Sequence, residues 1–140
     1  MFGILLLTTL DIMNREKIKE LRPNITAIDK AAAVTPEERF QNQVLRPILK
    51  FQNLLLLKVY QHYLIQRKRQ FHKLSNPKEK LAYIEHSVQK DSKLRELLLG
   101  LVIGYFTVEE YDTYLENEKP IRKRIIDLLV QRLQDQMDKI

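Results

Sequence analysis

Hydrophobic residues recur every three or four positions in several stretches of the chain, a spacing typical of amphipathic helices. In the first long stretch, Thr35 can cap a helix, Pro36 takes the first helical position and Glu38 can reach back to complete a capping box. Comparable starts occur at Asn76, Asp91, Thr107 and Lys119. No stretch of four or more residues combines a clean alternation of apolar and polar side chains with the composition of a strand. We therefore expect an all-α fold without a sheet, a compact bundle of about five main helices.

The longest helical pattern ends near Lys73 and contains Pro47. Proline removes a helical hydrogen bond and disfavours helical geometry in the residue before it, so we expect a kink there. The tripeptide Phe-Gln-Asn occurs twice, beginning at Phe40 and at Phe51. Eleven residues of continuous helix return to within roughly 20° of the starting face. The pattern therefore predicts a Pro-kinked spine helix from Pro47 to Lys73, with Phe40 and Phe51 on one apolar stripe.

Residues 92–105 are apolar almost all round, which is typical of a helix buried on every side. Gly100 and Gly104 stand one turn apart, a spacing that lets a neighbouring backbone approach closely. We expect this segment to be the buried centre of the bundle.

The chain begins with a short apolar stretch, residues 1–12, that carries no preceding cation and no small-residue cleavage site. It is far too short to span a bilayer. We expect residues 1–12 to be an extension outside the core and residues 13–140 to be a single helical domain. No membrane span is expected.

The composition narrows the functional classes. The chain has 140 residues, of which 44% are hydrophobic and 30% charged, as in soluble globular domains. It has no cysteine, which excludes disulfides, thiolate metal sites and cysteine nucleophiles and fits a reducing compartment such as the cytoplasm.

The formal net charge of +6 suggests contact with a polyanion. The candidate residues lie in segment 67–80, and they are Arg67, Lys68, Arg69, Lys73, Lys78 and Lys80. The first three point about 100° apart on a helix, however, so a solvated helix end explains them equally well. A third interpretation is pairing with the acidic helix expected at residues 108–117.

The remaining polar residues do not form a known catalytic or metal-binding pattern. His62, His72 and His86 are ten and fourteen residues apart, and none has a second ligand on the same turn. Glu109 and Glu110 are accounted for by the capping box that begins at residue 107. We therefore expect no catalytic residue, no cofactor and no metal.

Four strings carry a family resemblance: "FQNQVLRPILKFQN", "KLAYIEHSVQKD", "LLLGLVIGYFTVEEY" and "RLQDQM". In these strings the chain resembles a family of short all-helical bacterial proteins of uncharacterised function, some of which are automatically labelled glyoxalase. The resemblance covers residues 13–138 and implies the same helical fold. The label implies either βαβββ modules with histidine and glutamate ligands or an H-x-H-x-D-H motif, and this sequence has neither, so it supplies no catalytic residue.

Extended helical surfaces without site chemistry lead us to expect a non-catalytic cytosolic interaction module that binds a protein partner or itself. An RNA- or DNA-associated protein that uses segment 67–80 is the first alternative. A small-molecule enzyme, as the glyoxalase label implies, is the second.

Overall fold

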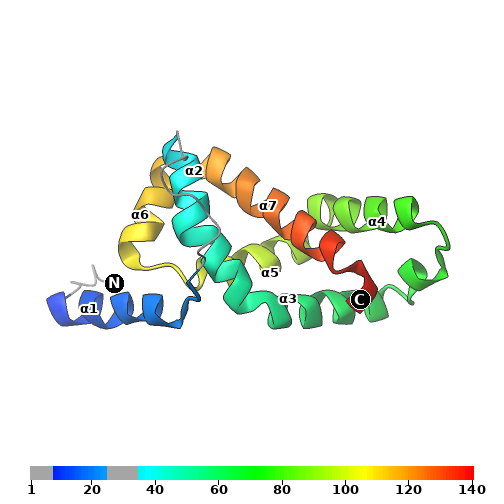
Figure 1. Cartoon of the computed structure of the whole chain (residues 1–140), viewed down its shortest axis with the longest axis horizontal. Coiled ribbons are helices and arrows are strands. Elements are labelled where there is room, and N and C mark those ends of the chain that lie inside the picture. The colour runs from blue at the N-terminus through cyan, green and yellow to red at the C-terminus, as the bar shows by residue number, and fades with distance from the viewer. Residues whose placement is uncertain (1–7, 25–34) are drawn as a thin grey trace, which may run out of the picture.

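Helices make up nearly all of the chain in the computed structural model, which describes residues 8–24 and 35–140 (Figure 1). The α-helices are α1 Thr9–Glu16, α2 Pro36–Phe40, α3 Arg46–Gln66, α4 Pro77–Lys90, α5 Ser92–Ile103, α6 Val108–Glu116 and α7 Glu118–Asp135. Short 3-10 helices cover Lys17–Leu21, Gln70–Lys73 and Met137–Lys139, and a π-helical turn covers Gln41–Leu45. No strand occurs in the described ranges, so the predicted all-α fold is confirmed. Nor is any helix in those ranges long and apolar enough to cross a membrane.

Side-chain caps begin the helices where the sequence predicts them. The Thr107 Oγ1 accepts a hydrogen bond from the Glu110 amide at 3.1 Å, and Glu110 Oε1 accepts one from the Thr107 amide at 2.8 Å, which completes the capping box of α6. The side chains of Thr35, Asn76 and Asp91 cap α2, α4 and α5 by each accepting a hydrogen bond from an amide of the first helical turn. These caps satisfy amide groups that have no partner inside their own helices.

The π-helical turn Gln41–Leu45 ends two residues before Pro47, with Arg46 between them. Arg46 keeps helical angles although a proline follows it, and its amide donates to the carbonyl of Gln41, five residues back. A π-helical turn inserts one extra residue into a helix and is one of the known causes of bending. The helical path changes direction between α2 and α3, as the predicted kink requires (Figure 1).

The extra residue also changes which side chains face the core. Phe40 and Ile48 are buried, but Phe51 is 40% exposed and Leu55 is 47% exposed. One inserted residue rotates the following helix face by about 100°. The apolar stripe predicted through Phe40 and Phe51 is therefore only partly buried, with Phe51 at the exposed edge of the fold.

The spine helix ends at Gln66 and not at Lys73 as predicted. Lys68 and Arg69 adopt left-handed backbone angles, with φ of 57° and 56°. Their amides donate to the carbonyls of Ile65 and Leu64, both at 3.0 Å. This pair of bonds is a Schellman motif, in which Lys68 occupies the position that usually holds glycine. Sequence reasoning missed this end because no glycine marks it.

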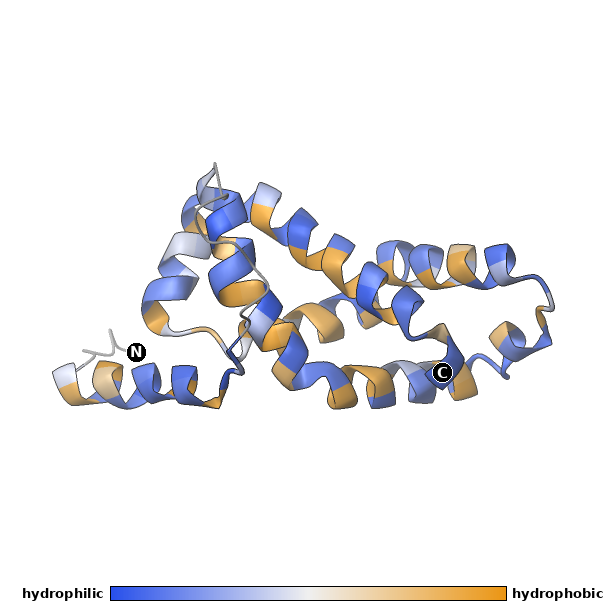
Figure 2. Ribbon diagram, in the orientation of Figure 1, coloured by the Kyte–Doolittle hydropathy of each residue, from blue (hydrophilic) through white to orange (hydrophobic). Residues whose placement is uncertain are grey.

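The core lies between α3, α4, α5 and α7. α5 contributes one face to it, through Leu94, Leu98, Leu99 and Val102. Its opposite face is open, since Leu97 is 51% exposed and a side chain at Gly100 would meet no atom within 4 Å. The predictions that α5 is buried on every side and that a backbone packs closely on Gly100 are therefore wrong. Hydrophobic positions lie along both α3 and α5 (Figure 2).

Two arginines bind the N-terminal helices to the turn between α5 and α6 through hydrogen bonds. Arg15 donates to the carbonyls of Gly104 and Phe106, at 2.5 and 3.0 Å, and Arg22 donates to that of Tyr105 at 2.7 Å. Cations are favourable at a helix C-terminus, where the carbonyl groups carry partial negative charge. The predicted extension at residues 1–12 lies partly outside the described residues, and residues 9–12 of it belong to α1.

Arg22 also forms the most buried ion pair of the described residues. Its Nη1 and Nη2 atoms bond the two carboxylate oxygens of Glu110 at 2.8 and 2.6 Å, and both side chains are about one-tenth exposed. Burial raises the pKa of Glu110, but Arg22 and the Thr107 amide outweigh it and hold the pKa below its ordinary value. Glu110 thus caps α6 and binds the N-terminal segment to it.

Candidate interaction groove

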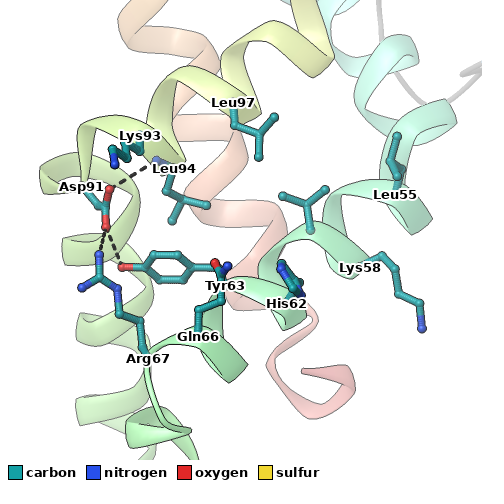
Figure 3. A pocket seen from close by; sticks show the side chains of 11 residues that line it. Leu55, Lys58, His62, Tyr63, Gln66, Arg67, Asp91, Lys93, Leu94 and Leu97 are labelled. Carbon is teal, nitrogen blue, oxygen red and sulfur yellow. Dashed lines mark hydrogen bonds and ion pairs between the residues drawn. The ribbon is translucent and has the colours of Figure 1, made fainter.

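A cavity of about 510 Å³ lies between the second half of α3 and the first half of α5 (Figure 3). It is open on one side and is lined by Leu55, Lys58, Val59, His62, Tyr63, Gln66, Arg67, Asp91, Lys93, Leu94 and Leu97. We call it the α3–α5 groove.

The floor of the groove is apolar. Leu94 is buried beneath it, and Val59 and Tyr63 are half-buried. Leu55 on α3 and Leu97 on α5 lie on opposite sides of the hollow, and each is about half exposed (Figure 3). Large aliphatic side chains that line a concave surface are typical of binding sites for apolar groups.

Three residues close one end of the groove. Asp91 Oδ2 accepts hydrogen bonds from Tyr63 Oη at 3.1 Å and from Arg67 Nη2 at 2.5 Å, while Asp91 Oδ1 accepts the Leu94 amide at 3.3 Å (Figure 3). The Arg67 guanidinium also lies 5.2 Å from the centre of the Tyr63 ring. The end wall therefore joins the C-terminus of α3 to the N-terminus of α5.

The titration of the end wall follows from these contacts. Burial raises the pKa of Asp91, but the Leu94 amide, Tyr63 and Arg67 outweigh it and the pKa is lowered. Burial, followed by the hydrogen bond to Asp91, raises the pKa of Tyr63. Asp91 is thus held as a carboxylate and Tyr63 as a neutral donor.

The remaining charge of the groove is positive. Lys58 and Lys93 are exposed, and neither makes an ion pair with any residue in the described part of the chain. Asp91 is the one acid among the lining residues, and Arg67 is already paired with it. The groove thus combines an apolar floor with two lysines that lack an acidic partner.

The structure separates the six predicted polyanion-binding residues. Arg67 lies in the end wall, and the Lys80 Nζ lies 5.3 Å from the centre of the buried Phe71 ring. The other four are exposed and make no ion pair with a described residue; they are Lys68, Arg69, Lys73 and Lys78. No ion pair of the described residues joins segment 67–80 to α6, so the predicted alternative in which these two segments neutralise each other is wrong.

The three histidines are not brought together. His62 lines the α3–α5 groove, while His86 lines a separate, more polar hollow of about 600 Å³ beyond the end wall. A ring nitrogen of His72 lies 3.3 Å from the Ile140 carbonyl. Among the described residues, no group of three or more histidine, aspartate and glutamate side chains could hold a metal ion.

Sequence reasoning missed the groove, although one signal pointed to it. Leu54–Leu57 are four consecutive leucines, which together point to every side of a helix. One buried face cannot hold them all, and Leu54 and Leu55 are exposed while Leu56 and Leu57 are buried. Residues 92–105 are likewise apolar almost all round. Both segments therefore have more apolar side chains than one core-facing side of a helix can bury.

No protein-family model matches the chain, and no curated protein or solved structure matches it significantly. The resemblance to a family of short helical bacterial proteins therefore stays a prediction.

Proposed function

We propose that the protein is a non-catalytic helical interaction module of the cytoplasm, and that its α3–α5 groove binds an acidic amphipathic helix of a protein partner. The observation that carries the proposal is the pairing of two half-exposed leucines, Leu55 and Leu97, with two unpaired lysines, Lys58 and Lys93, around one open groove.

The chemistry of the groove favours a helix as its occupant. Two packed helices form its sides, and grooves of this kind accept the apolar face of an amphipathic helix through side chains at i, i+3 and i+4. The exposed leucines supply the apolar contact. The lysines favour a partner with acidic residues beside its apolar stripe, because complementary charge speeds encounter and selects among partners.

A designed peptide tests this proposal without a known partner. The probe is a synthetic helix with leucine at i and i+4 and glutamate on the flanking positions, titrated into the full-length protein and followed by amide NMR shifts. We expect shifts that concentrate at Val59, Leu97 and their neighbours. A peptide with lysine in place of every glutamate is the matched control and should bind at least about tenfold more weakly.

A variant checks that the groove is the site. Leu97→Glu replaces an apolar contact at one side of the groove with a carboxylate that repels the acidic peptide. Because the position is exposed, this variant should fold normally and lose most of the peptide affinity. Leu54→Glu, on an exposed leucine outside the lining set, should bind the peptide like the wild type. Equal binding by both variants, or no shift at millimolar peptide, would contradict the proposal.

A second candidate function is nucleic-acid binding by the turn after α3. It is favoured by the four exposed cations Lys68, Arg69, Lys73 and Lys78, which lack acidic partners among the described residues. Unpaired cations that bind phosphates release counterions, so affinity must fall steeply as salt rises. Fluorescence anisotropy with labelled duplex and single-stranded oligonucleotides at several salt concentrations measures this dependence. A flat slope, or an unchanged slope when Lys73 and Lys78 are both replaced by glutamate, would exclude this function.

A further inference from the structure

We infer that the acidic amphipathic helix that fits the α3–α5 groove is α6 of a second copy of this chain, so that the protein associates head to tail. This inference rests on the proposed function, because it names the occupant of the same groove.

The outer face of α6 has the required pattern. Tyr111 and Leu115 stand four residues apart and are 42% and 50% exposed. Residues spaced by three or four positions are neighbours on a helix surface, so the two apolar side chains form one short stripe. Asp112 and Glu116 are exposed and lie along one side of this stripe.

The acids of this face are also available. Asp112 and Glu116 make no ion pair with a residue in the ranges 8–24 and 35–140. Glu110, a nearby acid, is already bound by Arg22 and is buried in the fold. The outer face of α6 thus has two exposed apolar side chains with two unpaired carboxylates along one side.

The two surfaces are complementary in kind. Tyr111 and Leu115 would contact the exposed leucines of the groove, Leu55 and Leu97. Asp112 and Glu116 complement the charge of Lys58 and Lys93. The chain has a formal net charge of +6, so the acidic face of α6 differs in sign from the chain as a whole. The basic groove of a second copy can bind this acidic face.

One chain cannot satisfy both surfaces by itself. The groove lies at the first half of α5, whereas α6 follows the far end of that 12-residue helix. A helix of this length is about 18 Å long, and Figure 1 shows α6 at the end of the molecule away from the turn after α3. The contact must therefore form between copies. Because the two patches differ, the contact is heterologous and builds open chains unless its rotation closes a ring.

Paired charge reversals test the inference. The groove variant carries Lys58→Glu and Lys93→Glu, and the α6 variant carries Asp112→Lys and Glu116→Lys. All four positions are exposed, so both variants should keep the helical circular dichroism of the wild type. We expect sedimentation velocity to show wild-type association that grows with concentration, and each variant alone to associate at least about tenfold more weakly because like charges now face each other.

An equimolar mixture of the two variants is the decisive sample. In the mixture each acidic surface again meets a basic one, so association should return to within about threefold of the wild type. Both variants keep a positive net charge, and general attraction therefore cannot explain the recovery. Reversal of Lys73 and Lys78 is the matched control, since it changes the same number of charges outside both surfaces and should leave association unchanged.

The outcomes separate the two claims. A wild-type chain that stays monomeric at every concentration, or a mixture that fails to recover, overturns the second-copy inference. If the designed acidic peptide still binds the groove in that case, the proposed function stands without it. If the peptide does not bind and the mixture does not recover, both claims fail.

Discussion

Arg67, the residue after α3, and Asp91, the cap of α5, are joined by a contact of 2.5 Å between Nη2 and Oδ2. Asp91 therefore has two roles, because one of its oxygens caps a helix and the other closes the end of the groove. The same residue sets both the start of α5 and the distance between the two sides of the site.

Substitutions at Asp91 should separate these two roles. Asp91→Ala removes the cap and the ion pair, and we expect it to lower the free energy of unfolding by about 1 to 2 kcal/mol. Asp91→Asn keeps a good capping oxygen but puts an amide nitrogen in place of Oδ2, so the ion pair with Arg67 and the hydrogen bond from Tyr63 are lost. Because the Arg67 side chain is 53% exposed, this variant should cost less than about 1 kcal/mol. Urea unfolding at neutral pH measures both values. An equal loss of unfolding free energy in the two variants would contradict the claim that the helix cap contributes more than the ion pair.

Glu110 should make stability depend on pH. Its pKa in the folded protein lies below its ordinary value of 4.5, so the stability it contributes is complete above that value and is lost as the pH falls through the folded pKa. Glu110→Gln keeps the capping acceptor but removes the charge that pairs with buried Arg22, and should cost about 3 kcal/mol at pH 7.

The difference between wild type and Glu110→Gln should shrink when urea unfolding is repeated below the ordinary pKa. Glu109→Gln is the matched control, because Glu109 is exposed in the same helical turn and should matter by less than about 1 kcal/mol. A Glu110→Gln effect that is the same at both pH values would refute the pairing.

The two glycines of α5 and its C-cap should respond oppositely to alanine. Gly100 is in the helix interior and a side chain there meets nothing within 4 Å, so Gly100→Ala should raise the free energy of unfolding by about 0.5 to 1 kcal/mol. A side chain at Gly104 would stand 2.9 Å from the Gly100 carbonyl oxygen, so Gly104→Ala should lower it by about 1 kcal/mol. Thermal and urea unfolding of both variants check the signs, and stabilisation by both substitutions would contradict the described packing.

The left-handed turn at Lys68 should favour glycine. Lys68→Ala removes the long side chain but keeps the Cβ atom that makes this conformation costly, whereas Lys68→Gly removes both. We expect Lys68→Gly to be more stable than Lys68→Ala by about 1 kcal/mol. The comparison isolates the backbone, since both variants lose the same charge, and equal stability would show that the turn is not left-handed in solution.

Local signals predicted the helix starts well because a cap depends on residues within one turn. Thr107 with Glu110 shows this, since both halves of the capping box are present. The end of α3 was not predicted, because the Schellman turn has Lys68 where glycine is usual. Tertiary packing offsets the cost of the left-handed backbone there. The π-helical turn before Pro47 likewise has no local signature, and it moved Phe51 from the core to the edge of the fold.

The groove could not be predicted because it depends on how two helices meet. Leu55 and Leu97 are 42 positions apart in the numbering, and periodicity alone assigns each of them equally well to the core. Only the packing of α3 on α5 shows that both stay half exposed around one hollow. The six cations of segment 67–80 stand out in the sequence. Of these six, only Arg67 lines the α3–α5 groove.

The absence of cysteine makes site-specific cross-linking the most direct test of the central claim, that α6 of one copy lies in the α3–α5 groove of another. Leu97→Cys and Leu115→Cys are mixed and treated with a short bis-maleimide, and Glu85→Cys on α4 replaces Leu115→Cys in the control. We expect Leu97→Cys to cross-link to Leu115→Cys at least about tenfold faster than to Glu85→Cys. Equal rates for the two pairs would contradict it.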